Sequence, residues 1–111
     1  MNGKKEQIIL RPQENPYKIV TESMGDSGSD LKSFYFKRVA NFYVFSYENE
    51  GIRRHTFIDT GDRLYRDRIL TILSDNNVNP KNIERIIITH HHPDHCGLID
   101  VLGRASGARI L

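Results

Sequence analysis

The chain has 111 residues, enough for one folding unit of ordinary size. Hydrophobic residues make up 38% of it, which excludes a chain too polar to form a core. The formal net charge is +2, with both signs scattered and no basic stripe, so a nucleic-acid partner is not expected. The longest apolar runs, 42–45 and 86–88, fall far short of the roughly 20 residues that span a bilayer, so no membrane partner is expected either. The single cysteine, Cys96, cannot form an intrachain disulfide, which predicts a reducing, cytoplasmic setting.

The N-terminal third shows weak patterning. Residues 1–16 contain Pro12 and Pro16 and mixed charge, and we expect them to form a loosely held leader before a domain unit at 17–111. Tyr17–Thr21 is a candidate strand. Glu22–Ser33 is rich in Gly, Ser and Asp, which predicts a loop that either connects two elements or covers a substrate.

A hairpin follows. Asn41–Tyr47 is aromatic and β-branched, and a similar stretch resumes at Ile52–Asp59 after a turn that includes Gly51. We expect the aromatic side chains to fill the core and a sheet face. A platform for stacking bases would need interleaved basic residues, which are absent here.

A strand–helix–strand unit comes next. Apolar residues at helical spacing predict a helix from Asp62, as N-cap, to about Asn76. Asn79-Pro80 suits a short capped turn, and Arg85–Thr89 contains three isoleucines in a row, as in a parallel strand buried on both faces. We expect a last helix from about Asp94 to Ala105, a stop at Gly107 and a new strand at Ala108–Leu111. The residues expected to be buried in that helix are Leu98, Ile99, Val101 and Leu102.

The unit places potential metal ligands at one sheet edge. Asp59 and His90 follow two parallel strands, and open α/β sheets carry their sites at this carboxyl edge. In extended chain His90 and His92 point the same way, while Asp94 and His95 would lie in the first helical turn. Imidazole nitrogen and carboxylate oxygen suit Zn²⁺ and neighbouring first-row metals. The opposite parity of His91 predicts that it faces away, and we expect Cys96 to be a packing residue rather than a nucleophile.

These residues carry a family resemblance. His90-x-His92-x-Asp94-His95 resembles the H-x-H-x-D-H signature of the metallo-β-lactamase-fold hydrolases. Upstream, Asn41-Phe42-Tyr43-Val44-Phe45 and Asp59-Thr60-Gly61 occur in the family's order and spacing. The resemblance covers residues 17–111 and implies an α+β fold, the N-terminal half of an αβ/βα sandwich.

The resemblance also implies a chemistry. His90 and His92 would ligate a first metal, and Asp94 and His95 a second, with two Zn²⁺ ions per intact domain or Fe or Mn in their place. In such a site a metal-bridging hydroxide attacks an ester, thioester or similar bond of a small-molecule substrate. Asp94 would also accept a proton from the bridging water and so be catalytic. Asp59 would orient a ligand histidine through a hydrogen bond.

Two departures leave alternatives open. The family often has two glycines after the motif, whereas Gly97 is followed by Leu98. The family's remaining ligands, two histidines and a bridging aspartate, come from a second half that is not in this sequence. The chain could therefore be an incomplete, non-catalytic metal-binding or interaction module. A flavodiiron-like oxidoreductase is a further alternative, although that group typically has glutamate where His92 stands. We also expect an exposed apolar sheet face, to be covered by the remaining half of the domain or by a second copy.

Overall fold

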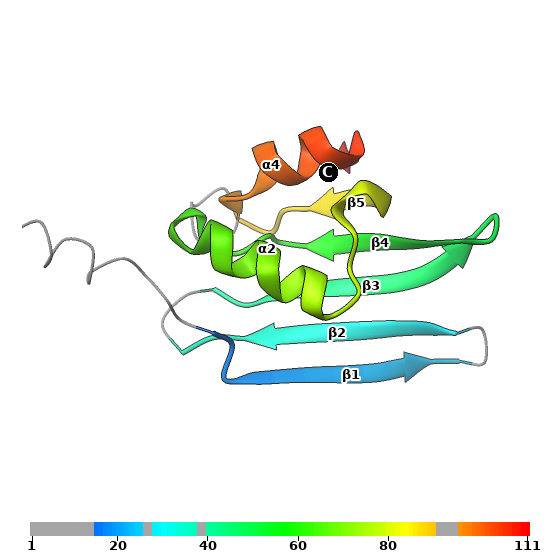
Figure 1. The fold of residues 1–111 in the computed structure, drawn as a ribbon, viewed down its shortest axis with the longest axis horizontal. Coiled ribbons are helices and arrows are strands. Elements are labelled where there is room, and N and C mark those ends of the chain that lie inside the picture. The colour runs from blue at the N-terminus through cyan, green and yellow to red at the C-terminus, as the bar shows by residue number, and fades with distance from the viewer. Residues whose placement is uncertain (1–14, 26–27, 38–39, 91–95) are drawn as a thin grey trace, which may run out of the picture.

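The computed structural model describes residues 15–25, 28–37, 40–90 and 96–111, and their centre is one six-stranded sheet (Figure 1). The strands lie in chain order: β1 (Lys18–Met24), β2 (Ser29–Tyr35), β3 (Phe42–Asn49), β4 (Ile52–Ile58), β5 (Ile83–Ile87) and β6 (Arg109–Ile110). The first four pair antiparallel, and β5 runs parallel to both β4 and β6. The mixed sheet with helices confirms the predicted α+β class and the strand–helix–strand unit.

The first helical segment begins and ends where the sequence predicts it. The first consists of a 3-10 turn, η1 (Arg63–Tyr65), that continues into α2 (Arg66–Asp75). The Asp62 carboxylate accepts a hydrogen bond from the Leu64 amide at 2.9 Å, the N-cap interaction expected of it. Asn79 caps η2 (Pro80–Asn82) in the same way. None of the helices in the described ranges is both long and apolar enough to cross a membrane.

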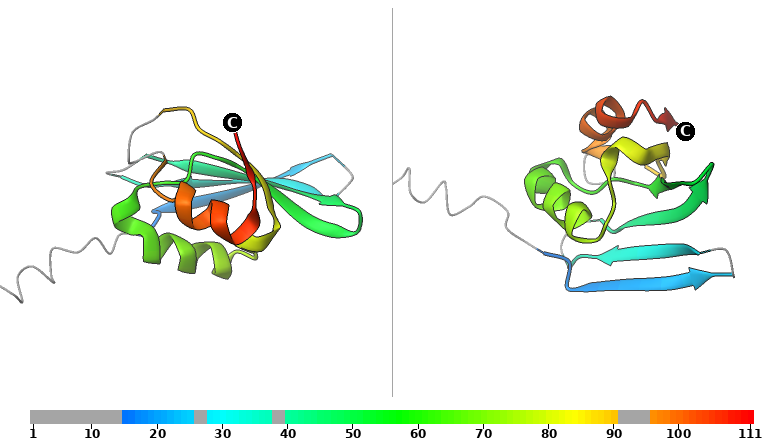
Figure 2. Two further views of the ribbon diagram at one scale, coloured as in Figure 1. Left: turned by 90° about the horizontal axis from the view of Figure 1, so that it is seen from above. Right: turned by 45° about the vertical axis from the view of Figure 1, so that its right-hand side comes forward.

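Helices α2 and α4 (Ile99–Ser106) lie on the same face of the sheet (Figure 2). The core fills the space between them and that face. Phe42 stacks between Phe34, at 4.6 Å between ring centroids, and Phe57, at 6.2 Å. All three rings are fully buried. The aromatic residues of the hairpin therefore belong to the core, as predicted.

The predicted loop at Glu22–Ser33 is wrong in part. Strand β1 continues to Met24, and β2 already begins at Ser29. Gly28, with φ +79°, precedes the second strand, a backbone conformation that favours glycine. The polar residues that suggested a loop face one another within the sheet, since Asp30 on β2 is bonded to Lys32 and Arg53.

Two expected boundaries also shift. Strand β5 covers Ile83–Ile87 rather than Arg85–Thr89, and of its isoleucines Ile86 is fully buried while Ile87 is 36% exposed. The last helix, α4, starts at Ile99 after a turn at residues 97–98, rather than at about Asp94; the segment 91–95 lies outside the described residues. Leu98 and Leu102 are buried as predicted, whereas the other two expected core residues of this helix, Ile99 and Val101, are only half-buried.

The second face of the sheet is covered by no helix among the described residues (Figure 2). Strand pairing places mostly apolar side chains on it, which define what we call the open face: Leu31, Tyr43, Phe45, Ile58 and Ile87. Ser33 and Thr56 lie among these apolar side chains on the same face. Apolar side chains gathered on an uncovered sheet face are typical of a face that packs against another structure.

Candidate metal centre

Strands β4 and β5 run parallel, so the residues after both lie at one edge of the sheet. Asp59 follows β4 directly, and its amide donates to the Ile87 carbonyl at 2.8 Å. Its φ of +63° is in the left-handed region, which few residues other than glycine, asparagine and aspartate adopt. The side chain is almost fully buried. A buried carboxylate needs hydrogen-bond partners, and the neighbouring strand end supplies them.

Both oxygens of the Asp59 carboxylate bind Thr89. Oδ1 accepts from the Thr89 amide at 2.8 Å, and Oδ2 accepts from the Thr89 hydroxyl at 2.6 Å. The same hydroxyl lies 3.0 Å from Nδ1 of His90. Its one proton goes to Asp59, so it can only accept from His90. We therefore assign the proton of a neutral His90 ring to Nδ1. The lone pair that can bind a metal is then on Nε2.

Thr60 and Gly61 hold the other end of the motif segment. The Thr60 hydroxyl accepts from the Leu98 amide at 3.0 Å, and the Gly61 carbonyl accepts from the Gly97 amide at 3.2 Å. Gly61 has a φ of +87°, and a Cβ there would lie 2.6 Å from Cδ1 of Ile69. The Asp-Thr-Gly turn thus fixes the chain immediately before and immediately after the predicted ligands.

The described residues contain only part of the predicted site. Asp59 and His90 lie at one edge and are joined through Thr89. The other predicted ligands, His92, Asp94 and His95, lie outside the described residues, as does His91. Within the described ranges no group of three or more His, Cys, Asp or Glu side chains could hold a metal. The fit of a metal to this edge rests on the His90 donor and its orientation through Thr89.

Thr89 and Thr60 are residues of the site to which the sequence pattern alone assigned no role. Thr89 directly precedes the first histidine, and Thr60 is the middle residue of the Asp-Thr-Gly turn. These positions, next to predicted site residues, could have indicated a role for both threonines. Their hydrogen bonds depend on the pairing of β4 with β5, which sequence spacing alone does not give.

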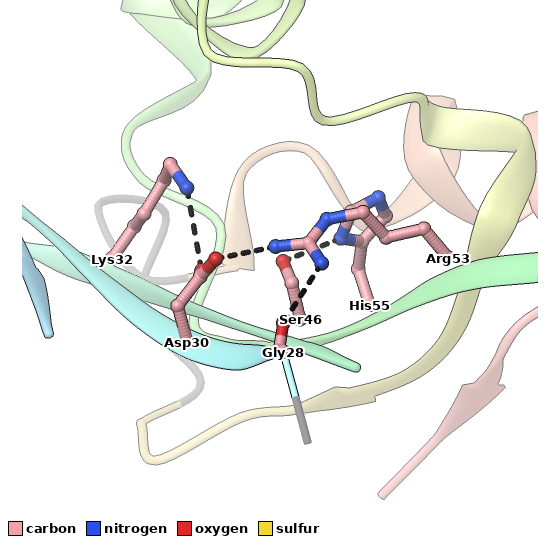
Figure 3. A network of polar contacts seen from close by, with 6 residues as sticks. All are labelled: Gly28, Asp30, Lys32, Ser46, Arg53 and His55. Carbon is pink, nitrogen blue, oxygen red and sulfur yellow. Dashed lines mark hydrogen bonds and ion pairs between the residues drawn. The ribbon is translucent and has the colours of Figure 1, made fainter. Parts of the chain in front are cut away.

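A second polar cluster lies at the far end of the sheet (Figure 3). The Ser46 hydroxyl is 2.7 Å from Nδ1 of His55, and both residues are only 1% exposed. Asp30 is directed toward Lys32 and Arg53. A serine and a histidine at this distance could form a nucleophile and base. Burial keeps substrate from both, so we interpret the pair as a structural hydrogen bond between β3 and β4.

Comparison with known proteins identifies the family. The model of the metallo-beta-lactamase superfamily matches residues 40–111, well over half of the chain. A 7,8-dihydropterin-6-methyl-4-(beta-D-ribofuranosyl)-aminobenzene-5'-phosphate synthase from Methanocaldococcus jannaschii is 36% identical over 55 residues. That match covers 50% of this chain and 18% of the relative.

Solved structures share the fold at lower identity. The peroxy diiron species of a chemotaxis sensor superposes with a TM-score of 0.64 at 19% identity, over 84% of this chain and 37% of that one. A subclass B3 metallo-beta-lactamase of Bradyrhizobium japonicum superposes with a TM-score of 0.62 at 16% identity, and the match covers 88% of this chain and 34% of that one. A flavoprotein from Thermotoga maritima superposes with a TM-score of 0.57 at 23% identity, and the match covers 84% of this chain and 26% of that one. The chain thus spans about a third of the length of these proteins, and it belongs to the metallo-beta-lactamase superfamily.

Proposed function

We propose that this chain is the ligand-bearing N-terminal half of a metal-dependent hydrolase. The observation that supports this most directly is the Asp59–Thr89–His90 hydrogen-bond series, because it leaves Nε2 of His90 as a metal donor. His90 and His92 would bind a first metal, and Asp94 and His95 a second, with Zn²⁺ as the expected ion and Fe or Mn as substitutes. The substrate is a small molecule with an ester, thioester or similar bond.

Each residue of the proposed site has a separate role. When bound, the metal pair lowers the pKa of water and stabilises negative charge on the attacked group. Asp94 would hold the metal and serve as the proton acceptor. Asp59 holds Thr89, and Thr89 holds the His90 ring in the tautomer that can bind metal. Thr60 and Gly61 fix the far end of the segment, so the ligands keep their spacing.

Completion of the site requires further protein. Four ligands from one strand–helix junction cannot enclose two ions at the usual separation of about 3.5–4 Å. We propose that the open face packs against the remaining half of the domain or against a second copy, and that this part supplies the missing ligands. A cytoplasmic setting is proposed on the ground that one cysteine cannot form an intrachain disulfide.

A di-iron oxidoreductase is the second candidate, because the diiron chemotaxis sensor and the Thermotoga maritima flavoprotein share the fold. His92 in place of the glutamate typical of flavodiiron proteins favours the hydrolase. The third candidate, a non-catalytic module, would bind metal but never gain the second set of ligands.

Metal analysis and hydrolysis assays separate these candidates. We expect the 111-residue chain to bind at most one Zn²⁺, weakly, and a protein that also contains the complementary half to bind about two. His90→Ala should abolish binding, whereas the matched control His91→Ala should have little effect. In the larger protein Asp94→Asn should nearly abolish turnover of ester and thioester substrates. Two tightly held ions in the 111-residue chain, or equal damage from the two histidine variants, would contradict the proposal. Tight binding of iron, together with oxygen reduction and no hydrolysis, would favour the oxidoreductase. Metal binding without turnover in the larger protein would favour the non-catalytic module.

A further inference from the structure

An open hollow of about 410 Å³ lies at the edge of the sheet opposite Asp59 and His90. Strand β5 begins there, β6 follows the end of α4 there, and Arg54 on β4 contributes to its wall. The volume is within the usual range for small-molecule sites, about 300–1,000 Å³. The hollow lies away from the candidate metal centre, because β4 and β5 both end at the other edge.

The lining of this hollow is strongly basic. It includes four cationic side chains, Arg54, Lys81, Arg85 and Arg109, and one carboxylate, Glu84, which gives a formal charge of four minus one, or +3. The C-terminal end of α4 adds only about half a negative charge. An excess of this size in one concave surface attracts anions.

The one carboxylate is already engaged. Glu84 accepts from the Tyr47 hydroxyl at 2.7 Å and from the Asn49 amide at 3.1 Å, and it lies 3.8 Å from Nε of Arg54. The hydrogen bond from Tyr47 is the main reason that the pKa of Glu84 falls below its usual value. Glu84 therefore stays ionised, and its single negative charge acts on both Arg85 and Arg54, so most of the positive charge of the lining is left unbalanced.

The cations of the lining are only partly balanced by a counter-charge. Arg85 and Arg109 are directly opposite each other on β5 and β6. Like charges in such a pair destabilise a sheet. In the part of the chain that the structure describes, neither Lys81, Arg85 nor Arg109 forms an ion pair with a carboxylate. Arg85 donates only to the Tyr47 hydroxyl, at 3.3 Å.

We propose that this hollow binds the phosphate group of a small molecule. The planar guanidinium groups of Arg85 and Arg109 can each donate two parallel hydrogen bonds to phosphate oxygens, and Lys81 adds a compact positive charge. A bound dianion relieves the repulsion between the two arginines across the strand pair. The site shares no residue with the metal centre. Arg85 lies on the same sheet face as Ile87, so the proposal requires this end of the open face to stay accessible when the rest of that face is covered.

Calorimetric titration of the 111-residue chain with inorganic phosphate, against chloride at matched ionic strength, tests the site. We expect saturable binding that Arg109→Gln weakens at least threefold and Arg85→Gln with Arg109→Gln at least tenfold. Arg66→Gln, which removes an exposed cation on α2, is the matched control and should change affinity less than twofold. Circular dichroism checks folding, and Arg109→Gln alone decides the matter if the double variant unfolds, because no hydrogen bond or ion pair of the Arg109 side chain occurs among the described residues.

Three results would overturn the proposal. The first is phosphate binding that does not saturate above the chloride control. The second is an equal loss of affinity in Arg66→Gln, which would indicate a general charge effect. The third is tight, strongly salt-dependent binding of a short uridine oligonucleotide by a chain that does not bind inorganic phosphate, which would indicate a polyanion surface.

Discussion

His55 should make the stability of the fold depend on pH. Its side chain is 1% exposed and bonded to Ser46. Burial is the main reason that the pKa of His55 falls from 6.5 to about 4. Among its charged neighbours Arg53 and Lys32 lower the pKa further, and Asp30 opposes them (Figure 3).

The sign follows from proton uptake. Between pH 6.5 and about 4 the unfolded chain binds a proton at His55 and the folded chain does not. The free energy of unfolding therefore falls as the pH falls through this range, by about 1.4 kcal/mol for each pH unit. Over the whole interval the loss amounts to roughly 3 kcal/mol, a large share of the stability of a small domain.

Urea unfolding followed by circular dichroism at pH 7.5, 6.5, 5.5 and 5.0 measures this loss. The range above pH 5 avoids most carboxylate titration, including that of Glu84. We expect a loss of about 2 kcal/mol between pH 6.5 and 5.0. His55→Gln keeps a polar group beside Ser46 and should remove most of the pH dependence. An unchanged slope in that variant, or a wild-type stability that is constant over the range, would refute the reasoning.

Three further variants test other parts of the structure. Gly61→Ala should cost about 1–3 kcal/mol by thermal unfolding, because of its positive φ and the short approach to α2; a neutral change would contradict the described turn. Thr89→Val should weaken Zn²⁺ binding about tenfold, while Thr71→Val on the exposed side of α2 should not. The open face should make the 111-residue chain associate and bind a hydrophobic dye. Ile87→Lys should reduce this in sedimentation experiments and Leu64→Lys, which changes an exposed residue outside that face, should not.

Local patterns were sufficient for much of the fold. The turn at Gly51, the cap at Asp62 and the stop at Gly107 each depend on one residue and its neighbours, and all are confirmed. Strand β2 was missed because its polar residues satisfy one another across strands. Arg53 lies on β4, two strands away, so no short stretch of sequence reveals that Asp30 has a partner.

For the candidate site, the sequence predicted which residues share an edge of the sheet, but not the hydrogen bonds that join them. The parallel pairing of β4 and β5 brings Asp59 and His90 to one edge, as expected from the alternation of strand and helix. The intermediate role of Thr89 required atomic register, because its hydroxyl contacts a carboxylate 30 residues away. The prediction that His91 faces away stays a prediction.

The turn at Asp59–Gly61 attaches the chain on both sides of the predicted ligands mainly through backbone groups of the attached segments. Most of the hydrogen bonds that it makes to the flanking chain involve main-chain amides, those of Thr89, Gly97 and Leu98. Side chains between these points can change without loss of the attachment. A metallo-beta-lactamase and a protein described as a diiron species share the fold of this chain at less than 25% identity. The fold that positions the candidate site therefore does not by itself determine the chemistry of that site.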